Sequence, residues 1–242
     1  SFPTRRSSDL LSGRIKVMLK VDDVRRLIIE KYKNQDFVID KTGVKTVELI
    51  GASFIADEPS FFGTINHDWN QRELEWYKSQ SLYVKDIPGK IPVIWEQISS
   101  KTNDVGKINS NYGYLIWSKE NGSQYENVLK ELKSNPDSRR GQMVYTRPSI
   151  HTDYNKDGMS DFICCSNTVH FIRNNQLVST VYFRSNDIRF GYTGDWAFAN
   201  YVHQSLAKDL GIEAGNIIWN AASFHLYERH FNLLDEWIAK GY

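Results

Sequence analysis

The stretch ICCSNTVHFIRNNQLVSTVYFRSND, residues 163–187, decides the fold of this chain. It contains two runs rich in β-branched and aromatic residues, Thr168–Ile172 and Leu177–Phe183, which are separated by Asn174-Asn175. Such runs are typical of strands, and asparagine tolerates the positive φ angles that a tight hairpin turn requires. The pattern therefore predicts an antiparallel pair of strands.

Helical and strand patterns are mixed over the rest of the chain. We expect helices over Val21–Gln35, Arg72–Ser79, Ser123 onward, Trp196–Leu210 and Phe231–Lys240, and strands over Phe37–Ile39, Val47–Phe54, Gln142–Thr146 and Asn216–Phe224. The expected helix ends are Asp22 or Asp23 as a cap, a capping box of Ser123 with Glu126, and Gly211 as a stop. Because the elements do not alternate strictly, the predicted fold class is α+β, with a large mixed sheet flanked by helices.

Composition limits the class of protein. The chain has 242 residues, 40% of them hydrophobic, and a formal net charge of +1. This length fits a single domain, which we place at residues 15–242, and the Ser/Arg-rich start, residues 1–14, is expected to be a disordered or artefactual lead-in. The charge balance argues against a nucleic-acid partner, and no apolar run is long enough to cross a membrane. Two adjacent cysteines make no ordinary disulfide framework, which indicates a reducing, cytoplasmic setting.

A thiol, an anion-binding group and an acid follow one another along the chain. Cys164 and Cys165 start the hairpin, an Arg-Ser-Asn-Asp run (184–187) ends it, and Asp195 and a His-x-Tyr sequence (225–227) come later. These are the parts needed to hold a nucleotide and attack its base. An isolated cysteine is more often a small core residue, but this pair follows a polar loop and has arginines on both sides that could lower a thiol's pKa.

Other charged residues could serve the same site. The pair Arg139-Arg140 lies in a turn, where a solvated basic loop is the usual meaning. Together with Arg184 and Lys41, these arginines could instead surround a phosphate through forked, charge-assisted hydrogen bonds. Glu73 alone would be a surface carboxylate, but beside a Trp-Tyr pair it could be a tuned acid–base group.

The loop Asp153–Asp161 suggests a different class of function. Oxygen-bearing side chains alternate along it and a glycine stands at its sixth position, as in a calcium-binding loop. An EF-hand requires a glutamate at the twelfth position, which is Cys164 here, so an ordinary polar turn is the preferred interpretation. A calcium-binding module stays as the non-enzyme alternative, and no metal is assigned.

Several long runs resemble the thymidylate synthase superfamily and, within it, the deoxycytidylate 5-hydroxymethyltransferases of T-even-like bacteriophages. The matching runs are DKTGVKT (40–46), QRELEWY (71–77), INSNYG (108–113), NPDSRRG (135–141), YTRP (145–148), residues 153–162, RSND (184–187) and residues 217–227. The resemblance runs from about Phe37 to the C-terminal helix. It implies a thymidylate synthase-like fold and a homodimer that forms through the sheet.

The resemblance also implies a reaction at C5 of a pyrimidine nucleotide, with 5,10-methylenetetrahydrofolate as the one-carbon cofactor. A cysteine adds to C6, C5 captures the one-carbon unit, and water adds to the methylene group that remains after tetrahydrofolate leaves. Thymidylate synthases deliver hydride at that last step instead. The implied partners are dCMP and folate, with no nucleic acid and no membrane, and the implied setting is the host cell cytoplasm if the chain is phage-encoded.

Roles for individual residues follow from the same resemblance. Glu73 organises water and proton transfer, and the residues that line the site are Trp95, Tyr112 and Asp187. The phosphate ligands are Arg184 and Ser185 on the chain that carries the thiol, Lys41 in a gripping loop where synthases carry arginine, and Arg139 and Arg140 from the other subunit. The ribose ligands are His225 and Tyr227, and the residues that face the base are Asn186 and Asp195.

Asp195 is the expected discriminator between pyrimidines. Synthases that act on uracil carry asparagine here, and an amide can donate to O4 and accept from N3–H. Cytosine offers an amino donor and a bare N3, so a carboxyl that accepts from the amine and shares a proton with N3 suits it better. A mispaired buried polar group costs roughly 1–3 kcal/mol, which is about a ten- to hundredfold preference. Asp195 is also a candidate N-cap for the helix expected to begin at Trp196.

The choice of nucleophile stays open at this stage. Counting from the neighbouring arginines favours Cys164, whereas the local run CSNTV favours Cys165. Strand phase places Cys165 on the same face as Asn167, in the family's order, and tips the interpretation towards Cys165.

The sequence thus predicts a homodimeric enzyme that transfers a hydroxymethyl group to C5 of dCMP. Hydroxymethylation of CMP and methylation of dUMP are the enzyme alternatives. The CMP alternative stays open because the implied contacts of His225 and Tyr227 are to the 3′-hydroxyl and do not exclude a 2′-hydroxyl. The resemblance further implies a C-terminal tail that helps to close over the folate. The sequence ends at Tyr242, so whether such a tail closes over the folate is not decided by the sequence.

Overall fold

The computed structural model describes residues 18–242, and the expected lead-in at residues 1–14 lies outside them. In this part, seven strands form one sheet in the order β1-β2-β7-β5-β4-β3, with β6 paired to β7 off this path. The strands are β1 (Val38–Ile39), β2 (Lys45–Ile55), β3 (Gln142–Val144), β4 (Cys165–Arg173), β5 (Gln176–Phe183), β6 (Asn186–Asp187) and β7 (Glu213–Tyr227). β5 and β6 run parallel to β7, and the other pairs are antiparallel.

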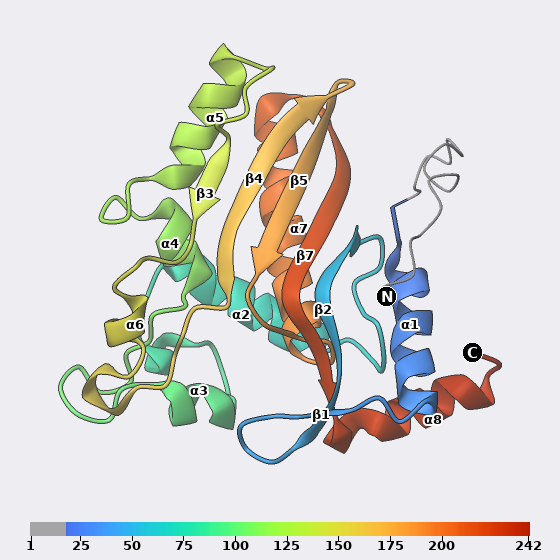
Figure 1. Cartoon of the computed structure of the whole chain (residues 1–242). Helices are drawn as coiled ribbons and strands as arrows, with labels where there is room; N and C mark the ends of the chain where they lie inside the picture. Colours follow the sequence, from blue (N-terminus) through green and yellow to red (C-terminus); the bar gives the residue numbers. More distant parts are fainter. Residues whose placement is uncertain (1–17) are drawn as a thin grey trace, which may run out of the picture.

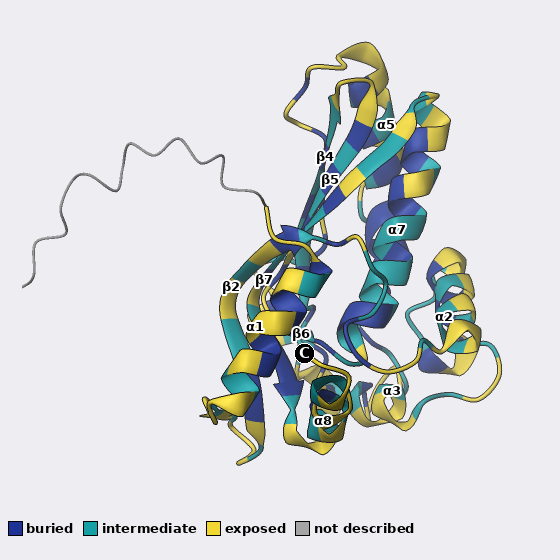
Figure 2. Cartoon of the chain, turned by 90° about the vertical axis from the view of Figure 1, so that its right-hand side faces the viewer, coloured by how far each residue is buried: buried dark blue, intermediate teal, exposed yellow. Residues whose placement is uncertain are grey.

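Helices flank this sheet (Figure 1). They are α1 (Val21–Lys33), α2 (His67–Ser79), α3 (Val93–Ile98), α4 (Tyr112–Trp117), α5 (Gln124–Ser134), α6 (Ile150–Asp153), α7 (Gly191–Leu210) and α8 (Phe231–Ala239). The long helix α7 lies along the central strands, and α2 and α5 lie on the same side of the sheet as α7 (Figure 2). The expected α+β fold with a large mixed sheet is therefore confirmed. None of the helices in the described part has the length and apolar character that a membrane crossing demands.

The predicted hairpin is formed by β4 and β5. Asn174 and Asn175 have φ angles of 51° and 58°, which is the left-handed conformation that a two-residue hairpin turn needs. The paired strands continue to the ends of the sequence runs that predicted them, so this part of the expectation is confirmed.

A bulge interrupts the hairpin ladder next to the cysteines. Cys165 pairs with Phe183, whereas Asn167 pairs with Tyr182, so two residues of β4 are spanned by one step of β5. Directly paired residues point to the same face, and neighbours along a strand point to opposite faces. Cys165 and Asn167 therefore lie on opposite faces, and the expectation that they share one is wrong.

Helix α7 starts five residues earlier than the sequence pattern indicates, at Gly191 and not at Trp196. Its N-cap is Phe190, so Asp195 lies inside the helix and the N-cap interpretation of that residue is wrong. Glycine is a poor helix former, and Gly191 and Gly194 concealed the first turn.

Three other helix starts also differ from expectation. Helix α2 begins at His67 and not at Arg72. Ser123 precedes α5 with a left-handed backbone and its side chain makes no capping hydrogen bond, so the predicted capping box is wrong. The N-cap of α1 is Lys20 and not Asp22 or Asp23. The side chain of Asp23 accepts a hydrogen bond from the backbone N–H of Lys20 at 2.9 Å. The short helices α3 and α4 were not predicted, because each spans only about two turns of apolar sequence.

Helix α2 approaches α4 closely at Gly113. A Cβ atom at this position would lie 1.8 Å from the carbonyl oxygen of Tyr77. The aromatic rings of Tyr77 and Tyr112 stack beside the contact, with centroids 5.6 Å apart, and Tyr77 meets Phe198 of α7 edge-on at 4.9 Å. This packing fixes α2, and with it Glu73, which lies one helical turn before Tyr77.

The face of the sheet turned away from α7 carries a transverse row of side chains, here called the outer row. Pairing aligns its members across five strands: Ser53, Asn220, Tyr182, Asn167 and Val144. Val144 and Tyr182 are 46% and 39% exposed although both are largely apolar. Within residues 18–242, the outer row is therefore a partly apolar surface that is left partly exposed.

Candidate active site

A cavity of about 950 Å³ brings most of the expected site residues together. Its size falls in the range of small-molecule sites, and its walls come from α2, α3, α4, α7, β6, β7 and the segment before β4. The expected residues that line it are Glu73, Trp95, Tyr112, Cys164, Ser185, Asn186, Asp187, Asp195, His225 and Tyr227.

The two cysteines have different surroundings. Cys164 precedes β4 and lines the cavity. Cys165 is 3% exposed and belongs to the hydrophobic core, on the sheet face that carries Phe183. The bulge that separates Cys165 from Asn167 removes the strand-phase argument for Cys165, and the thiol that lines the cavity is that of Cys164.

Arg184 is held beside the Cys164 thiol by backbone carbonyls. Its guanidinium donates to the carbonyl oxygens of Ile163 at 3.1 Å and of Phe162 at 2.7 Å, and it lies 4.5 Å over the Phe162 ring. Its Nη2 atom is 3.5 Å from Sγ of Cys164. A fixed positive charge therefore stands next to the sulfur atom.

Burial nevertheless controls the protonation of this thiol. It raises the pKa of Cys164 to about 11, and the Arg184 guanidinium acts in the opposite direction. The expectation that a neighbouring arginine lowers the thiol pKa is right in direction for Arg184, but burial outweighs it. The sulfur atom carries its proton at neutral pH, and a thiol must lose that proton before it can act as a nucleophile.

Two carboxyl groups lie close together around Gly194. Oε2 of Glu73 would be 2.9 Å from a Cβ atom at position 194, and Asp195 is the next residue along α7. Burial raises the pKa of Glu73 to about 7, with a hydrogen bond from Tyr77 acting against it. Burial also raises the pKa of Asp195 far above its usual value, and the charge of Glu73 raises it further. Both groups can therefore hold a proton near neutral pH.

Asn186 links Asp195 to the core. Its Nδ2 atom donates to Oδ2 of Asp195 at 2.7 Å, and its Oδ1 atom accepts from the indole Nε1 of Trp219 at 3.1 Å. Asn186 is 2% exposed and Trp219 is fully buried. The orientation of the Asn186 amide is thus set from behind the cavity wall.

His225 and Tyr227 lie side by side at the end of β7. Their rings meet edge-on with centroids 5.1 Å apart, and Nδ1 of His225 is 3.1 Å from the Ser223 hydroxyl. Burial lowers the pKa of His225, so its ring is neutral at pH 7. A neutral imidazole and a phenol can both hydrogen bond to hydroxyl groups.

Three expected phosphate ligands do not reach the cavity of their own chain. Lys41 lies in the exposed turn between β1 and β2. Arg139 and Arg140 are exposed in the segment before β3, where Arg140 forms an ion pair with Glu131 at 2.8 Å. The described chain therefore does not bring these cations to Cys164.

The carboxylates of the Asp153–Asp161 loop do not converge on an ion. Asp153 forms an ion pair with Arg147 at 2.8 Å, and Asp157 accepts from the side-chain amide of Asn103 at 2.9 Å. Within residues 18–242, no group of three or more His, Cys, Asp or Glu side chains is arranged to hold a metal ion. The loop carboxylates bind neighbouring segments, which gives the calcium interpretation no support.

Some cavity residues were missed by sequence reasoning. Asp161 was considered only as part of the loop, but it lines the cavity, is 4% exposed and accepts from the backbone N–H groups of Asn109 and Ser110 at 2.6 and 2.9 Å. Gly191 and Gly194 also line the cavity. Two glycines three apart share one face of a helix, and this spacing could have indicated a close approach there.

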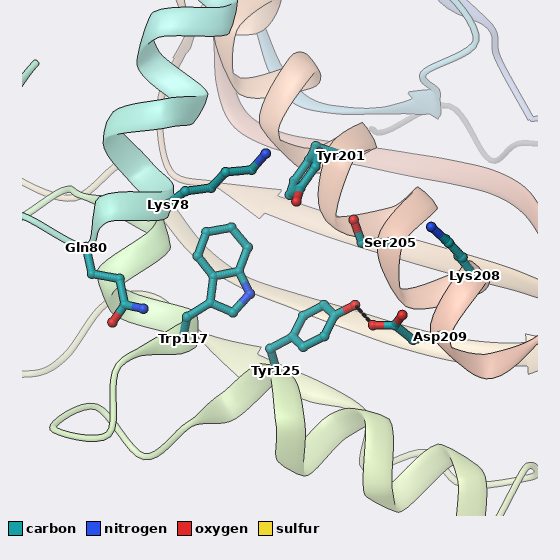
Figure 3. A pocket seen from close by; sticks show the side chains of 8 residues that line it. All are labelled: Lys78, Gln80, Trp117, Tyr125, Tyr201, Ser205, Lys208 and Asp209. Atoms are coloured by element: carbon teal, nitrogen blue, oxygen red, sulfur yellow. Dashed lines mark hydrogen bonds between the residues drawn. The ribbon is translucent and has the colours of Figure 1, made fainter. Parts of the chain in front are cut away.

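A second cavity of about 400 Å³ lies between α2, α4, α5 and α7 (Figure 3). The Tyr125 hydroxyl donates to Asp209 at 2.8 Å in its wall, and the Lys78 ammonium lies 4.3 Å over the Tyr201 ring. It contains neither a thiol nor any residue expected in the site. The larger cavity is therefore the candidate active site.

Comparison with known proteins agrees with this arrangement. The family profile described as Thymidylate synthase matches residues 23–241. The chain belongs to the thymidylate synthase family. The deoxycytidylate 5-hydroxymethyltransferase of Enterobacteria phage T4 is 52% identical over 230 residues, and that of phage T2 is 53% identical, with 92% of each chain covered in both cases. The thymidylate synthase of Fusobacterium nucleatum is 30% identical over 168 residues, 68% of this chain and 58% of that protein.

The resemblance inferred from the sequence motifs is thus confirmed. The highly similar curated relatives are hydroxymethyltransferases from phages, and the family implies a nucleotide substrate with a folate one-carbon donor.

Proposed function

We propose that this protein is a deoxycytidylate 5-hydroxymethyltransferase. It converts dCMP, 5,10-methylenetetrahydrofolate and water into 5-hydroxymethyl-dCMP and tetrahydrofolate. The observation that carries this proposal is one cavity in which the Cys164 thiol, the Glu73 carboxyl and the Asp195 carboxyl face a common space. The identity of 52% over nearly the whole chain to a relative with this activity supports it.

Cys164 is the proposed nucleophile. Its sulfur forms a bond to C6 of the cytosine ring as the thiol proton leaves, and the electron density moves to C5. The Arg184 guanidinium, 3.5 Å from the sulfur, stabilises the developing thiolate. The S–C6 bond breaks again once C5 has lost its hydrogen as a proton and carries the new substituent.

Glu73 is the proposed acid–base group. The step that distinguishes this reaction from thymidylate formation is the addition of water to a methylene group on C5. With a pKa of about 7, Glu73 can take a proton from that water at neutral pH and can return one.

The cavity suits a folate at its apolar wall. Ile91, Val93, Ile94 and Trp95 line this side, and Phe190 faces it from the start of α7. Val93, Ile94 and Phe190 are 60%, 56% and 59% exposed, which leaves apolar surface free to contact a conjugated ring system. The bound folate supplies a one-carbon unit at the oxidation level of formaldehyde.

Asp195 is the proposed reader of the base. As a neutral carboxyl it presents one bare and one protonated oxygen, which matches the amino group and bare N3 of cytosine. Its raised pKa supports this state. His225 and Tyr227 are the proposed ribose ligands.

Phosphate binding calls for a second copy of the chain. Arg184 and Ser185 supply ligands from the chain that carries Cys164, and Lys41 supplies one from its exposed turn. Arg139 and Arg140 then come from the partner subunit, which docks through the outer row. The half-exposed Val144 and Tyr182 support this interface. Because similar relatives belong to phages, the cytoplasm of an infected host is the proposed setting, with residues 15–242 as one catalytic domain.

One experiment tests the activity. The protein is incubated with the folate and with dCMP, dUMP or CMP, and the nucleotide products are weighed by mass spectrometry. We expect dCMP to gain a hydroxymethyl group and tetrahydrofolate to form. A methylated dUMP with dihydrofolate would indicate a synthase, and a modified CMP would indicate a ribonucleotide enzyme.

A second experiment tests the shared site. Cys164→Ser dimers and Arg139→Ala/Arg140→Ala dimers are each inactive or weak, and they are mixed under conditions that exchange subunits. If the arginines act across the interface, hybrids contain one intact site and activity rises on mixing. Activity that stays at the sum of the two preparations would contradict the shared site.

A further inference from the structure

Trp219 sits behind the cavity wall and carries no role in the reaction described above. It lies in the middle of β7, is fully buried, and its ring stacks on Phe183 at 4.9 Å with an interplanar angle of 11°. Tyr192 of α7 meets it edge-on at 5.0 Å. The indole is therefore held in one place by rings on two sides.

The indole makes one directional hydrogen bond. Nε1 can only donate, and its acceptor is Oδ1 of Asn186 at 3.1 Å. Because the amide oxygen of Asn186 must face Trp219, the amide nitrogen faces the other way. There it donates to Oδ2 of Asp195 at 2.7 Å. The chemistry of the indole thus decides which end of the Asn186 amide meets Asp195.

The direction of these bonds fixes the proton on Asp195. Oδ2 accepts from Asn186, so a neutral Asp195 carries its proton on Oδ1. One bare and one protonated oxygen then stand in a fixed order towards the base, and this order matches the edge of cytosine.

We propose that Trp219 is a positioning residue that sets the base preference of the site by holding the Asn186 amide in the orientation that donates to Asp195. The inference rests on the proposed function, since it concerns the choice between cytosine and uracil. Trp219 acts through Asn186 and touches neither base nor cofactor.

Loss of the indole N–H would free the amide to turn over. Its oxygen would then face Asp195 and accept the carboxyl proton, and the Asp195 oxygen left for the base would be bare. A bare oxygen accepts from the N3–H of uracil but offers nothing to the bare N3 of cytosine. Preference should therefore move from cytosine towards uracil.

The test compares Trp219→Phe, Asn186→Ala and the double variant with the unchanged protein. Dissociation constants for dCMP and dUMP are measured by calorimetry, and kcat/KM is measured for both nucleotides. We expect Trp219→Phe to lower the dCMP-to-dUMP preference by roughly tenfold, the size of one mispaired buried polar group. In the Asn186→Ala background, Trp219→Phe should lower the preference no further, because the two residues act in series.

The matched control is Trp196→Phe. Its indole Nε1 donates to the carbonyl oxygen of Ala56 at 2.9 Å, next to Asp195 in sequence but outside the Asn186 chain. This variant loses an indole hydrogen bond of the same kind and should keep the dCMP-to-dUMP preference.

Three results would overturn the inference: an unchanged preference in Trp219→Phe, effects that add in the double variant, or an equal change in Trp196→Phe. Should Trp219→Phe not fold, the indole proton resonance of Trp219 decides. In Asn186→Ala it must shift and exchange faster with water, and an unmoved resonance contradicts the hydrogen bond on which the inference depends. If the unchanged protein shows no preference for dCMP at all, the proposed function fails independently of Trp219.

Discussion

Two regions of the molecule contain a series of hydrogen-bonded, buried polar side chains: the wall of the large cavity and the core under the C-terminal half of α7. In the core the series is internally paired, whereas in the wall it ends on a carboxyl group that faces the cavity. The core holds a buried chain of hydrogen bonds from Thr168 through His170, Ser179 and His203 to the carbonyl of Gly215, with lengths of 3.1, 2.7, 2.7 and 3.1 Å. The wall holds the chain from Trp219 through Asn186 to Asp195. Beside this wall, Cys164 lines the cavity, whereas Cys165 is buried in the hydrophobic core.

The core chain is closed at both ends. Since a carbonyl only accepts, Nε2 of His203 carries the proton, and its Nδ1 accepts from the Ser179 hydroxyl. The Ser179 oxygen accepts in turn from Nδ1 of His170, whose Nε2 accepts from the Thr168 hydroxyl. Burial lowers the pKa of His170 to about 3 and lowers that of His203, so both rings are neutral.

The wall chain ends on a group with spare capacity. Asp195 accepts from Asn186 through Oδ2, and its carboxyl borders the cavity together with Cys164 and Glu73. Burial shifts pKa values in both regions, so a shifted pKa alone does not mark a site. What distinguishes the wall is that its polar atoms face a space that a ligand can fill.

The sharpest test of this comparison uses the neighbouring cysteines. Cys164→Ser should lower kcat by about four orders of magnitude or more, because the proposed nucleophile is lost, while the melting temperature changes little. Cys165→Ser should keep most of the activity and lose stability, since it places a hydroxyl in the core. Retention of activity by Cys164→Ser, with loss in Cys165→Ser, would reverse the assignment.

Replacement of Glu73 should have the next largest effect. Glu73→Gln keeps the shape but removes the acid–base group, so kcat should fall by about 10²- to 10⁴-fold. Glu73 has a pKa of about 7 in the fold against 4.5 in the unfolded chain, so the folded state binds more protons. Its contribution to stability is present at low pH and is lost as pH rises from 4.5 to about 7.

Glutamine does not ionise, so the Glu73→Gln variant does not lose this contribution to the free energy of unfolding as pH rises. Denaturant unfolding at several pH values should therefore show the variant gaining stability relative to the unchanged protein as pH rises through this window. A constant difference across the window would mean that Glu73 is not buried in its neutral form. Glu75→Gln, on the exposed side of the same helix, is the matched control.

A change at Asp195 should alter preference more than rate. Asp195→Asn supplies an amide whose N–H can serve O4 of uracil and whose oxygen can serve N3–H. We expect the ratio of kcat/KM for dCMP to that for dUMP to fall by about ten- to a hundredfold. An unchanged ratio would show that Asp195 does not recognise the base. The hydrogen bonds from Trp219 through Asn186 to Asp195 would then have no part in substrate choice.

Substitutions in the buried hydrogen-bond series of the core should change the stability of the protein and not its activity. His203→Leu leaves Ser179 and the Gly215 carbonyl without their partner, which should cost about 1–3 kcal/mol in the free energy of unfolding. Ser205→Ala, on the same helix, makes no such hydrogen bond and should change it by less than about 0.5 kcal/mol. A large fall in kcat in His203→Leu would mean that the core series affects the cavity, which would contradict the separation of the two regions.

The pH dependence of the same chain has a definite sign. Both histidines take up protons more readily in the unfolded chain, so stability should fall as pH drops below about 6.5 towards 3. This fall should be smaller in His203→Leu, which urea unfolding between pH 4 and 7 can measure.

Sequence patterns predicted the elements that local chemistry determines. The hairpin turn at Asn174 and Asn175 was predicted because asparagine accepts positive φ, and the family resemblance named ten of the residues that line the large cavity. The bulge beside Cys165 was not predictable, since a one-residue shift in pairing leaves no mark on composition. The start of α7 was missed because its glycines serve tertiary contacts at the cost of helix propensity.

The role of Trp219 illustrates the remaining gap. A tryptophan in a strand is typical of a buried core residue, and Trp219 is indeed fully buried. Its hydrogen bond to Asn186 joins residues 33 positions apart, so only the folded arrangement reveals it.

Gly113 limits how the reaction chamber can change. A single added methyl group there would collide with the Tyr77 backbone at 1.8 Å and would drive α2 outward. Glu73 travels with that helix, so its reach towards any bound base would lengthen without any alteration among the reacting groups. Redesign for bulkier nucleobases could therefore begin outside the chamber, at Gly113, where the smallest amino acid sets how closely the proposed acid–base group Glu73 approaches.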